Sequence, residues 1–208
     1  MSYEEEESIS NMYDQKIKIM VIGEELVGKT ALITKYTKNI FGGAYLSTVG
    51  IDFQDKFLNI NGKDIRIEIW DTAGQERFRN IAKNYFQSSN GFLLVYDITK
   101  KSSFEKLDFW NEQINLNAPK NTKYILIGNK INLENEREVQ KIDGENFAKN
   151  NNIQFYETSA KDGTNVNYVF ELLAKEIVNN GENNSTKSRR SSQVLKKKNT
   201  KVEKKSCC

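Results

Sequence analysis

The chain has 208 residues, enough for one domain of about 170 residues with a sizeable core but short for two. Its 38% hydrophobic and 28% charged residues are typical of a globular protein, and no apolar run approaches the roughly 20 residues that cross a bilayer. The two cysteines are the last two residues and histidine is absent, which excludes a disulfide-stapled core and a histidine base or metal ligand. The acidic segment 1–10 lacks the features of a signal peptide, so we expect a cytosolic protein.

The first predicted elements are a strand, a helix and a strand pair. The apolar run Lys16 to Ile22 predicts a buried strand, and a helical pattern covers Lys29 to Lys38. Ile51 to Ile60 and Asp64 to Asp71 flank Asn61-Gly62, which is the strongest short hairpin signal. We therefore expect one antiparallel pair of strands here.

The rest of the folded chain alternates between short apolar strands and helical patterns. The predicted strands are Gly91 to Asp97, Tyr124 to Gly128 and Gln154 to Thr158, and the helical patterns are Ser103 to Ile114, Asp143 to Asn150 and Asn165 to Val178. This alternation predicts an α/β fold with three layers, a six-stranded, mostly parallel sheet with one antiparallel strand, and about five helices. Ligands of such folds bind at the carboxyl edge of the strands.

A phosphate-binding pattern lies between the first predicted strand and helix. The segment from Gly23 to Thr30, GEELVGKT, fits G-x-x-x-x-G-K-[ST] and predicts a P-loop NTPase fold. Backbone N–H groups and the helix N-terminus can cradle phosphates, Lys29 can neutralise them, and the Thr30 hydroxyl can bind Mg²⁺. On this loop alone, a turn without ligand, an ATPase and a nucleotide kinase stay open.

Two further segments carry a resemblance to a known family. Ile69 to Arg79, IWDTAGQERFR, resembles the Rab branch of the Ras superfamily, and Ser47 to Phe53, STVGIDF, resembles the Rab first switch. The resemblance covers Lys16 to about Asn180. It implies a small GTPase that binds GTP or GDP with Mg²⁺ and hydrolyses GTP to GDP and phosphate. In this setting we interpret Trp70 as a packing residue.

The resemblance also implies the site residues. Thr30 and Thr48 would bind Mg²⁺ directly and Asp71 through water, while the Gly74 amide would sense the γ-phosphate. Gln75 would be the catalytic residue that orients the attacking water, a role that needs no histidine. The nucleotide-binding residues implied are Gly23, Glu25, Leu26, Val27, Gly28, Lys29, Thr30, Ala31, Phe41, Tyr45, Thr48, Asp71, Gly74, Asn129, Lys130, Asn132, Ser159, Ala160 and Lys161.

The guanine-reading loops depart from the family at one position. Asn129 to Asn132 resembles the Asn-Lys-x-Asp motif, but an amide stands where the family has a carboxylate that accepts two hydrogen bonds from guanine. An amide offers one acceptor and one donor group, so guanine affinity should fall by about ten- to a hundredfold. The same amide would favour a purine with a carbonyl in place of the amine, as xanthine has. We expect weakened but persisting guanine binding.

A second departure lies in the phosphate loop. Rab proteins usually have small residues where this chain has Glu25-Leu26. In the family, bulk at the Glu25 position crowds the space of Gln75 and of an activating protein's arginine finger. A carboxylate there also lies near phosphate oxygens unless a cation intervenes. We expect slow hydrolysis; a Glu25 side chain that turns to solvent and has no effect is the alternative.

The C-terminal tail carries most of the positive charge. Residues 181–208 hold nine lysines and arginines against two glutamates, a charge of +7, which leaves −4 for residues 1–180. The final Cys207-Cys208 is similar to the doubly geranylgeranylated ends of Rab proteins, and two lipids with a basic patch suffice for stable anchoring. Two thiols without lipid are the alternative. Nucleic-acid binding is disfavoured because the tail has no aromatic residues for base stacking.

Together these observations predict an acidic extension over 1–14, a GTPase domain over 15–180 and a flexible basic tail over 181–208. The predicted function is a membrane-anchored GTP/GDP switch in vesicle-mediated intracellular transport, on the cytoplasmic face of an endomembrane or vesicle with a cytosolic pool. Implied partners are an exchange factor, a GTPase-activating protein, effectors and a prenylation escort, with the chain itself a monomer. The alternative is a pseudo-GTPase interaction module with altered nucleotide binding and little hydrolysis.

Overall fold

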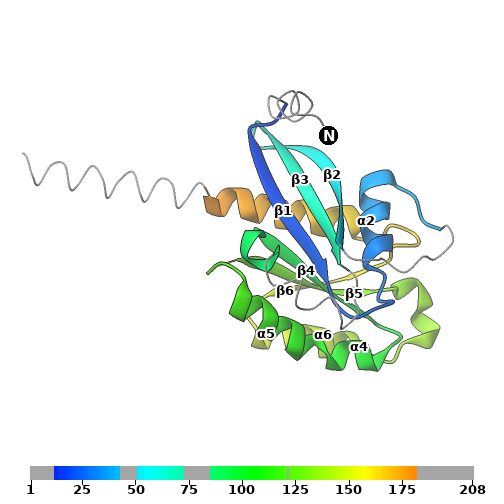
Figure 1. The fold of residues 1–208 in the computed structure, drawn as a ribbon. Coiled ribbons are helices and arrows are strands. Elements are labelled where there is room, and N and C mark those ends of the chain that lie inside the picture. Colours follow the sequence, from blue (N-terminus) through cyan, green and yellow to red (C-terminus); the bar gives the residue numbers. More distant parts are fainter. Residues whose placement is uncertain (1–11, 43–50, 73–84, 121, 182–208) are drawn as a thin grey trace, which may run out of the picture.

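The computed structural model describes residues 12–42, 51–72, 85–120 and 122–181 (Figure 1). A six-stranded sheet runs through them in the order β2-β3-β1-β4-β5-β6, and every neighbouring pair is parallel except β2 and β3. The strands are β1 (Gln15–Ile22), β2 (Ile51–Ile60), β3 (Lys63–Thr72), β4 (Gly91–Asp97), β5 (Lys123–Asn129) and β6 (Gln154–Thr158). The predicted sheet, with its single antiparallel strand, is confirmed.

Helices cover both faces of this sheet, which gives the three layers (Figure 1). The helices include α2 (Lys29–Lys38), α4 (Lys101–Glu105), α5 (Leu107–Asn117), the 3-10 helix η2 (Ile131–Glu136) and α6 (Lys141–Asn150). A last helix spans 166–181. On one face, α2 and the last helix lie together. On the other face, α4, α5 and α6 lie together.

Side-chain alternation along β1 explains why the protein has two apolar cores. Ile17, Ile19 and Val21 point into the core shared with α2 and the last helix, while Met20 and Ile22 point into the core shared with α4, α5 and α6. All five side chains have no exposed surface. Burying a side chain of this size contributes about 1.5 to 3 kcal/mol, so the two cores fix both helix layers onto the sheet.

The turn between β2 and β3 has the predicted hairpin chemistry. Asn61 and Gly62 both have positive φ angles, 55° and 78°, as the two central residues of a type I′ turn require. Asn59 lies opposite Asp64, and Ile60 lies opposite Lys63. The antiparallel register follows directly from this two-residue turn.

The helical stretch predicted over Ser103 to Ile114 differs from the structure. Two helices, α4 and α5, occupy it, with an interruption at Lys106. Lys106 keeps right-handed helical dihedral angles, φ −87° and ψ −3°, so the backbone continues in the same sense across the break. The apolar periodicity therefore runs through an interruption that it does not reveal.

The strands end at one edge of the sheet and bring distant residues there. Val21 lies beside Asp71, Asp97 lies beside Asn129, and Asn129 lies beside Thr158. The order in which strands are added to the sheet reverses at β1, since β3 lies on one side of it and β4 on the other. Such a reversal leaves a crevice at the carboxyl ends of the strands, where α/β proteins bind ligands.

Candidate functional site

The loop between β1 and α2 is shaped by two glycines. Gly23 has φ 141°, and a Cβ there would lie 2.1 Å from the backbone oxygen of Val95. Gly28 has φ 94°, and a Cβ there would lie 2.6 Å from Asn129 Nδ2. Any larger side chain would push the loop off β4 or off the base-reading loop, so both glycines of the phosphate pattern are required by close packing.

Lys29 is the first residue of α2, and its buried side chain hydrogen-bonds to the backbone of the phosphate loop. Its Nζ donates to the backbone oxygens of Gly23, at 3.0 Å, and Glu24, at 2.6 Å. Burial lowers the pKa of Lys29 to about 8. The carboxylates of Asp71, Glu24 and Glu25 oppose that shift. Because the pKa stays above 7, the amine is a cation at neutral pH, placed at a helix N-terminus where phosphate binds well.

Two of the three residues predicted to hold the metal meet at the start of the same helix. Thr30 Oγ1 donates to Asp71 Oδ2 at 2.5 Å, which joins α2 to the end of β3. The next residue, Thr72, donates to the Val21 backbone oxygen at 2.8 Å and so holds that strand end in place. A hydroxyl that donates its proton to a carboxylate keeps its lone pairs for a cation, and oxygen ligands of these kinds suit Mg²⁺. Thr30 and Asp71 therefore fit the predicted magnesium site.

Asn129 ties the phosphate loop to both base-reading loops. Its Nδ2 donates to the Val27 backbone oxygen at 2.9 Å, and its Oδ1 accepts from Thr158 Oγ1 at 3.1 Å. Only 1% of Asn129 is exposed. Lys130 follows with φ 73° and pairs with Asp97 at 2.6 Å. The side chain of Asn129 thus links three loops that lie up to 131 positions apart in the sequence.

Asn132 lies in η2, an element that the sequence did not predict. Its Oδ1 accepts from Ser159 Oγ at 2.9 Å. Ser159 Oγ also accepts from the Asp162 N–H at 3.3 Å, and Ser159 is fully buried. Beside it, Ala160 is buried and Lys161 is exposed. The structure therefore brings the two predicted base loops into direct contact.

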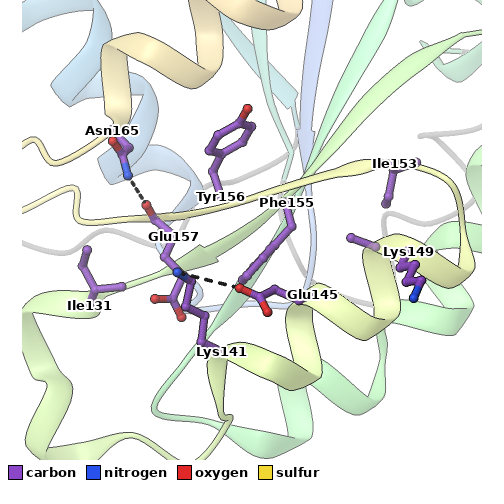
Figure 2. Close-up of a pocket in the computed structure, with 10 residues that line it drawn as sticks. Ile131, Lys141, Glu145, Lys149, Ile153, Phe155, Tyr156, Glu157 and Asn165 are labelled. Carbon is purple, nitrogen blue, oxygen red and sulfur yellow. Dashed lines mark hydrogen bonds and ion pairs between the residues drawn. The ribbon is translucent and has the colours of Figure 1, made fainter.

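Arg137 reinforces this contact, although no motif in the sequence predicted a role for it. The guanidinium donates to Glu157 Oε1 at 2.6 Å, Glu134 Oε1 at 2.8 Å and the Val139 backbone oxygen at 3.0 Å. Glu157 is the last residue before the Thr158 to Lys161 loop, and Asn165 Nδ2 donates to its backbone oxygen at 2.8 Å (Figure 2). Arg137 thus holds the segment after η2 against the end of β6.

A hollow of about 600 Å³ lies behind these loops, between α6 and β6 (Figure 2). Lysines and glutamates share its lining with apolar side chains such as Ile153 and Phe155. Its lining includes none of the residues predicted to bind the nucleotide. We assign the hollow no role in nucleotide binding.

Trp70 lies just before the metal site and packs as predicted. Its ring stacks on Phe53 at 5.2 Å and lies 5.0 Å from the Tyr85 ring. Lys18 Nζ is 5.3 Å from its centre. Phe53 is 40% exposed, so this aromatic group reaches the surface along β2.

Several predicted site residues lie outside the described residues: Tyr45, Thr48, Gly74, Gln75, Cys207 and Cys208. Phe41 is described and is 49% exposed. The remaining predicted residues gather around the phosphate loop and the two base loops. In the described part of the chain, no helix combines the length and apolar character needed to cross a bilayer.

The fold and these loops define a P-loop α/β protein. The family model of the Ras family matches residues 18–179. Ras-related protein Rab-13 of Canis lupus familiaris is 42% identical over 170 residues, which cover 82% of this chain and 84% of that protein. Ras-related protein Rab-26 of Rattus norvegicus is 42% identical over 168 residues, 80% of this chain and 65% of that protein. The chain belongs to the Rab small GTPases of the Ras superfamily, whose members bind GTP or GDP with Mg²⁺.

Proposed function

We propose that the chain is a membrane-anchored GTP/GDP switch in vesicle-mediated intracellular transport. The observation that carries the proposal is the contact at Asn129, whose side chain joins the phosphate loop at Val27 to the base loop at Thr158. A nucleotide seated here meets Lys29 at its phosphates and Asn132 at its base. The kinship to Rab proteins supports guanine as the base and transport as the setting.

In the proposed reaction, water attacks the γ-phosphorus, the bond to the β-phosphate oxygen breaks, and GDP and phosphate leave. Mg²⁺ neutralises phosphate charge when bound, with Thr30, Thr48 and Asp71 as its holders. Lys29 adds a fixed cation at the phosphates, and Gln75 orients the water. Catalysis of this type is mostly positioning and charge neutralisation. Loss of the γ-phosphate would release the segments around Thr48 and Gly74.

We also propose that hydrolysis is slow, because a glutamate, Glu25, lies within the phosphate loop. Its side chain is exposed, and its carboxylate is the weakest of the three that partly offset the lowering of the pKa of Lys29 by burial. A carboxylate near this amine competes with the γ-phosphate for electrostatic interaction with the Lys29 ammonium. Its bulk also occupies space that the family leaves for Gln75 and for an arginine from an activating protein.

Replacing Glu25 by serine should raise the single-turnover rate of GTP hydrolysis about tenfold. A like charge near the phosphates costs about 1 kcal/mol or more, and about 1.4 kcal/mol corresponds to a factor of ten in rate. Glu25→Gln keeps the bulk and removes the charge, so it separates the two causes. Equal rates for wild type and Glu25→Ser would mean that the side chain turns to solvent and has no effect.

The nucleotide that copurifies with the protein tests the switch itself. Denaturing the purified full-length protein and separating the released nucleotides should yield GDP or GTP. Magnesium chelation should speed its release, because Thr30 and Asp71 hold the phosphates only through the metal. Recovery of adenine nucleotides, or no binding of added GDP, would contradict the proposal.

The remaining features of the proposal are supported by the Rab kinship and the tail. We place the chain on the cytoplasmic face of an endomembrane or vesicle, with a cytosolic pool, held by lipids on Cys207 and Cys208. An exchange factor, a GTPase-activating protein, effectors and a prenylation escort are its proposed partners. The exposed Phe53 and its aromatic neighbours Trp70 and Tyr85 offer effectors an apolar surface.

A further inference from the structure

The last residue of β4, Asp97, is a buried carboxylate that is held through both of its oxygens. Only 3% of Asp97 is exposed. Its Oδ1 accepts from the Thr99 backbone N–H at 2.9 Å and from Thr99 Oγ1 at 2.8 Å. Its Oδ2 lies 2.6 Å from Lys130 Nζ. Because Thr99 fixes the rotation of the carboxylate, the second oxygen keeps a single direction, toward Lys130.

The two bonds to Thr99 are a local turn arrangement that recurs elsewhere in the chain without burial. Asp162 Oδ1 accepts from the Thr164 N–H at 2.9 Å and from Thr164 Oγ1 at 2.6 Å, and both of these residues are exposed. Water solvates the carboxylate in that loop. Asp97 is shielded from water at the edge of the sheet, where a carboxylate requires a cation, and Lys130 supplies it.

Lys130 is held at both ends of its side chain. Its backbone is left-handed, with φ 73° and ψ 33°, and its oxygen accepts from the Leu133 N–H at 2.8 Å. Its ammonium is held by Asp97. Between these ends the stem passes the phosphate loop, since a Cβ on Gly28 would lie 3.9 Å from Lys130 Cε. The side chain remains 30% exposed, so its ordered methylenes present an apolar edge to a ligand bound between the two loops.

The ion pair removes conformational freedom from a side chain that has a great deal of it. Lysine is among the side chains that lose most rotamer entropy when they are ordered. In this protein that loss occurs on folding, before any nucleotide binds. Without the carboxylate, the Lys130 ammonium would turn to water, and a nucleotide would have to order the stem again as it binds, which weakens binding.

We infer that Asp97 is a positioning residue of the nucleotide site: its carboxylate anchors the Lys130 ammonium and so holds the lysine stem in place between the phosphate loop and the base loop. This inference rests on the proposed nucleotide-binding function and adds to it a residue of β4. No sequence motif predicted a role for Asp97. The contact makes the retention of nucleotide depend on the end of β4 as well as on the two base loops.

Four full-length proteins test the inference: wild type, Asp97→Asn, Lys130→Met and the double variant. Asparagine keeps an oxygen for Thr99 and replaces the other by an N–H₂ group that cannot accept from an ammonium, while methionine keeps an unbranched stem and removes the charge. We expect Asp97→Asn to release GDP about tenfold faster, the effect of losing one hydrogen bond to a charged group. In the Lys130→Met background the same change should not speed release further, since no ammonium remains to be anchored.

A matched control separates the ion pair from a general effect of charge. Glu171→Gln removes one carboxylate from an exposed pair with Lys175 on the last helix, and its GDP release should equal that of wild type. Equal acceleration by Asp97→Asn in the wild-type and Lys130→Met backgrounds would mean that Asp97 only stabilises the fold, and that result would overturn the inference. So would acceleration by Glu171→Gln as large as that by Asp97→Asn.

The NMR signal of Lys130 Cε, assigned by its absence from Lys130→Met, reports the contact without nucleotide. It should shift in Asp97→Asn and stay unchanged in Glu171→Gln; an unchanged signal in Asp97→Asn would contradict the ion pair and overturn the inference. If wild type binds no guanine nucleotide, the proposed function fails and the inference fails with it, even where the signal shifts. If wild type binds GDP and Asp97→Asn releases it at the wild-type rate, the inference fails alone.

Discussion

Replacing Asn132 by aspartate is expected to tighten GDP binding by about ten- to a hundredfold. Ser159 Oγ already accepts from the Asp162 N–H, so its own proton is donated to Asn132 Oδ1. This bond turns the amide oxygen to Ser159 and leaves the amide N–H₂ for the base. A carboxylate can accept from Ser159 with one oxygen and present the other to guanine, whose ring N–H and amine are both donors.

Equilibrium titrations with GDP, XDP and ADP measure this effect. The Asn132→Asp protein should gain affinity for GDP and lose affinity for XDP, because xanthine presents a carbonyl where guanine has its amine. ADP is the matched control, since adenine lacks the pair of donors that a carboxylate would serve. Unchanged GDP affinity in Asn132→Asp would show that this position does not read the base. Adding Ser159→Ala to that protein should reverse part of the gain, because the second oxygen would lose its partner.

Most of the fold could be predicted because its signals are local. The seven residues of β4 are all buried, so an uninterrupted apolar run was enough to place the strand. The bounds of α2 were predicted correctly, and left-handed residues lie at both of its ends, Gly28 and Asn39. The interruption at Lys106 could not be predicted, because the helical periodicity continues across it. The helix η2 has six residues and no apolar repeat to reveal it.

The site was predictable only where its residues form a motif. The spacing of Gly23, Gly28 and Lys29 identified the phosphate loop, since the chemistry and the turn are encoded within eight positions. The hydrogen bond from Trp110 Nε1 to Glu24 Oε1 and the bonds from Arg137 to Glu157 each join residues from separate elements. Their pairing depends on the order of strands in the sheet, and no spacing in the sequence reports it. The departure at Asn132 was visible in the sequence, but the direction of its amide depends on Ser159.

Replacing both terminal cysteines by serine is expected to move the protein from membranes to the cytosol. Each buried methylene of a lipid chain contributes about 0.8 kcal/mol to membrane affinity, so the loss of two long chains outweighs any contribution from the tail's charge. Intact-mass spectrometry of the protein purified from its own cells detects the attached lipids directly, and subcellular fractionation shows whether the protein is on membranes or in the cytosol. A Cys207→Ser, Cys208→Ser protein that stays on membranes, or an unlipidated wild type, would contradict lipid anchoring.

The charge of the tail needs a separate control, because basic residues also bind anionic membranes. Each adds about 1 kcal/mol at an anionic surface, so replacing Lys196, Lys197 and Lys198 by alanine should weaken binding to anionic vesicles about a hundredfold. On neutral vesicles the same change should have no effect, whereas loss of the cysteines should abolish binding to neutral vesicles and weaken binding to anionic ones. GDP affinity should be the same in all these proteins, since residues 182–208 follow the last helix and lie far along the chain from the phosphate loop. A protein that binds anionic vesicles equally well with and without Cys207 and Cys208 would be held by charge, and its residence on membranes would then depend on ionic strength.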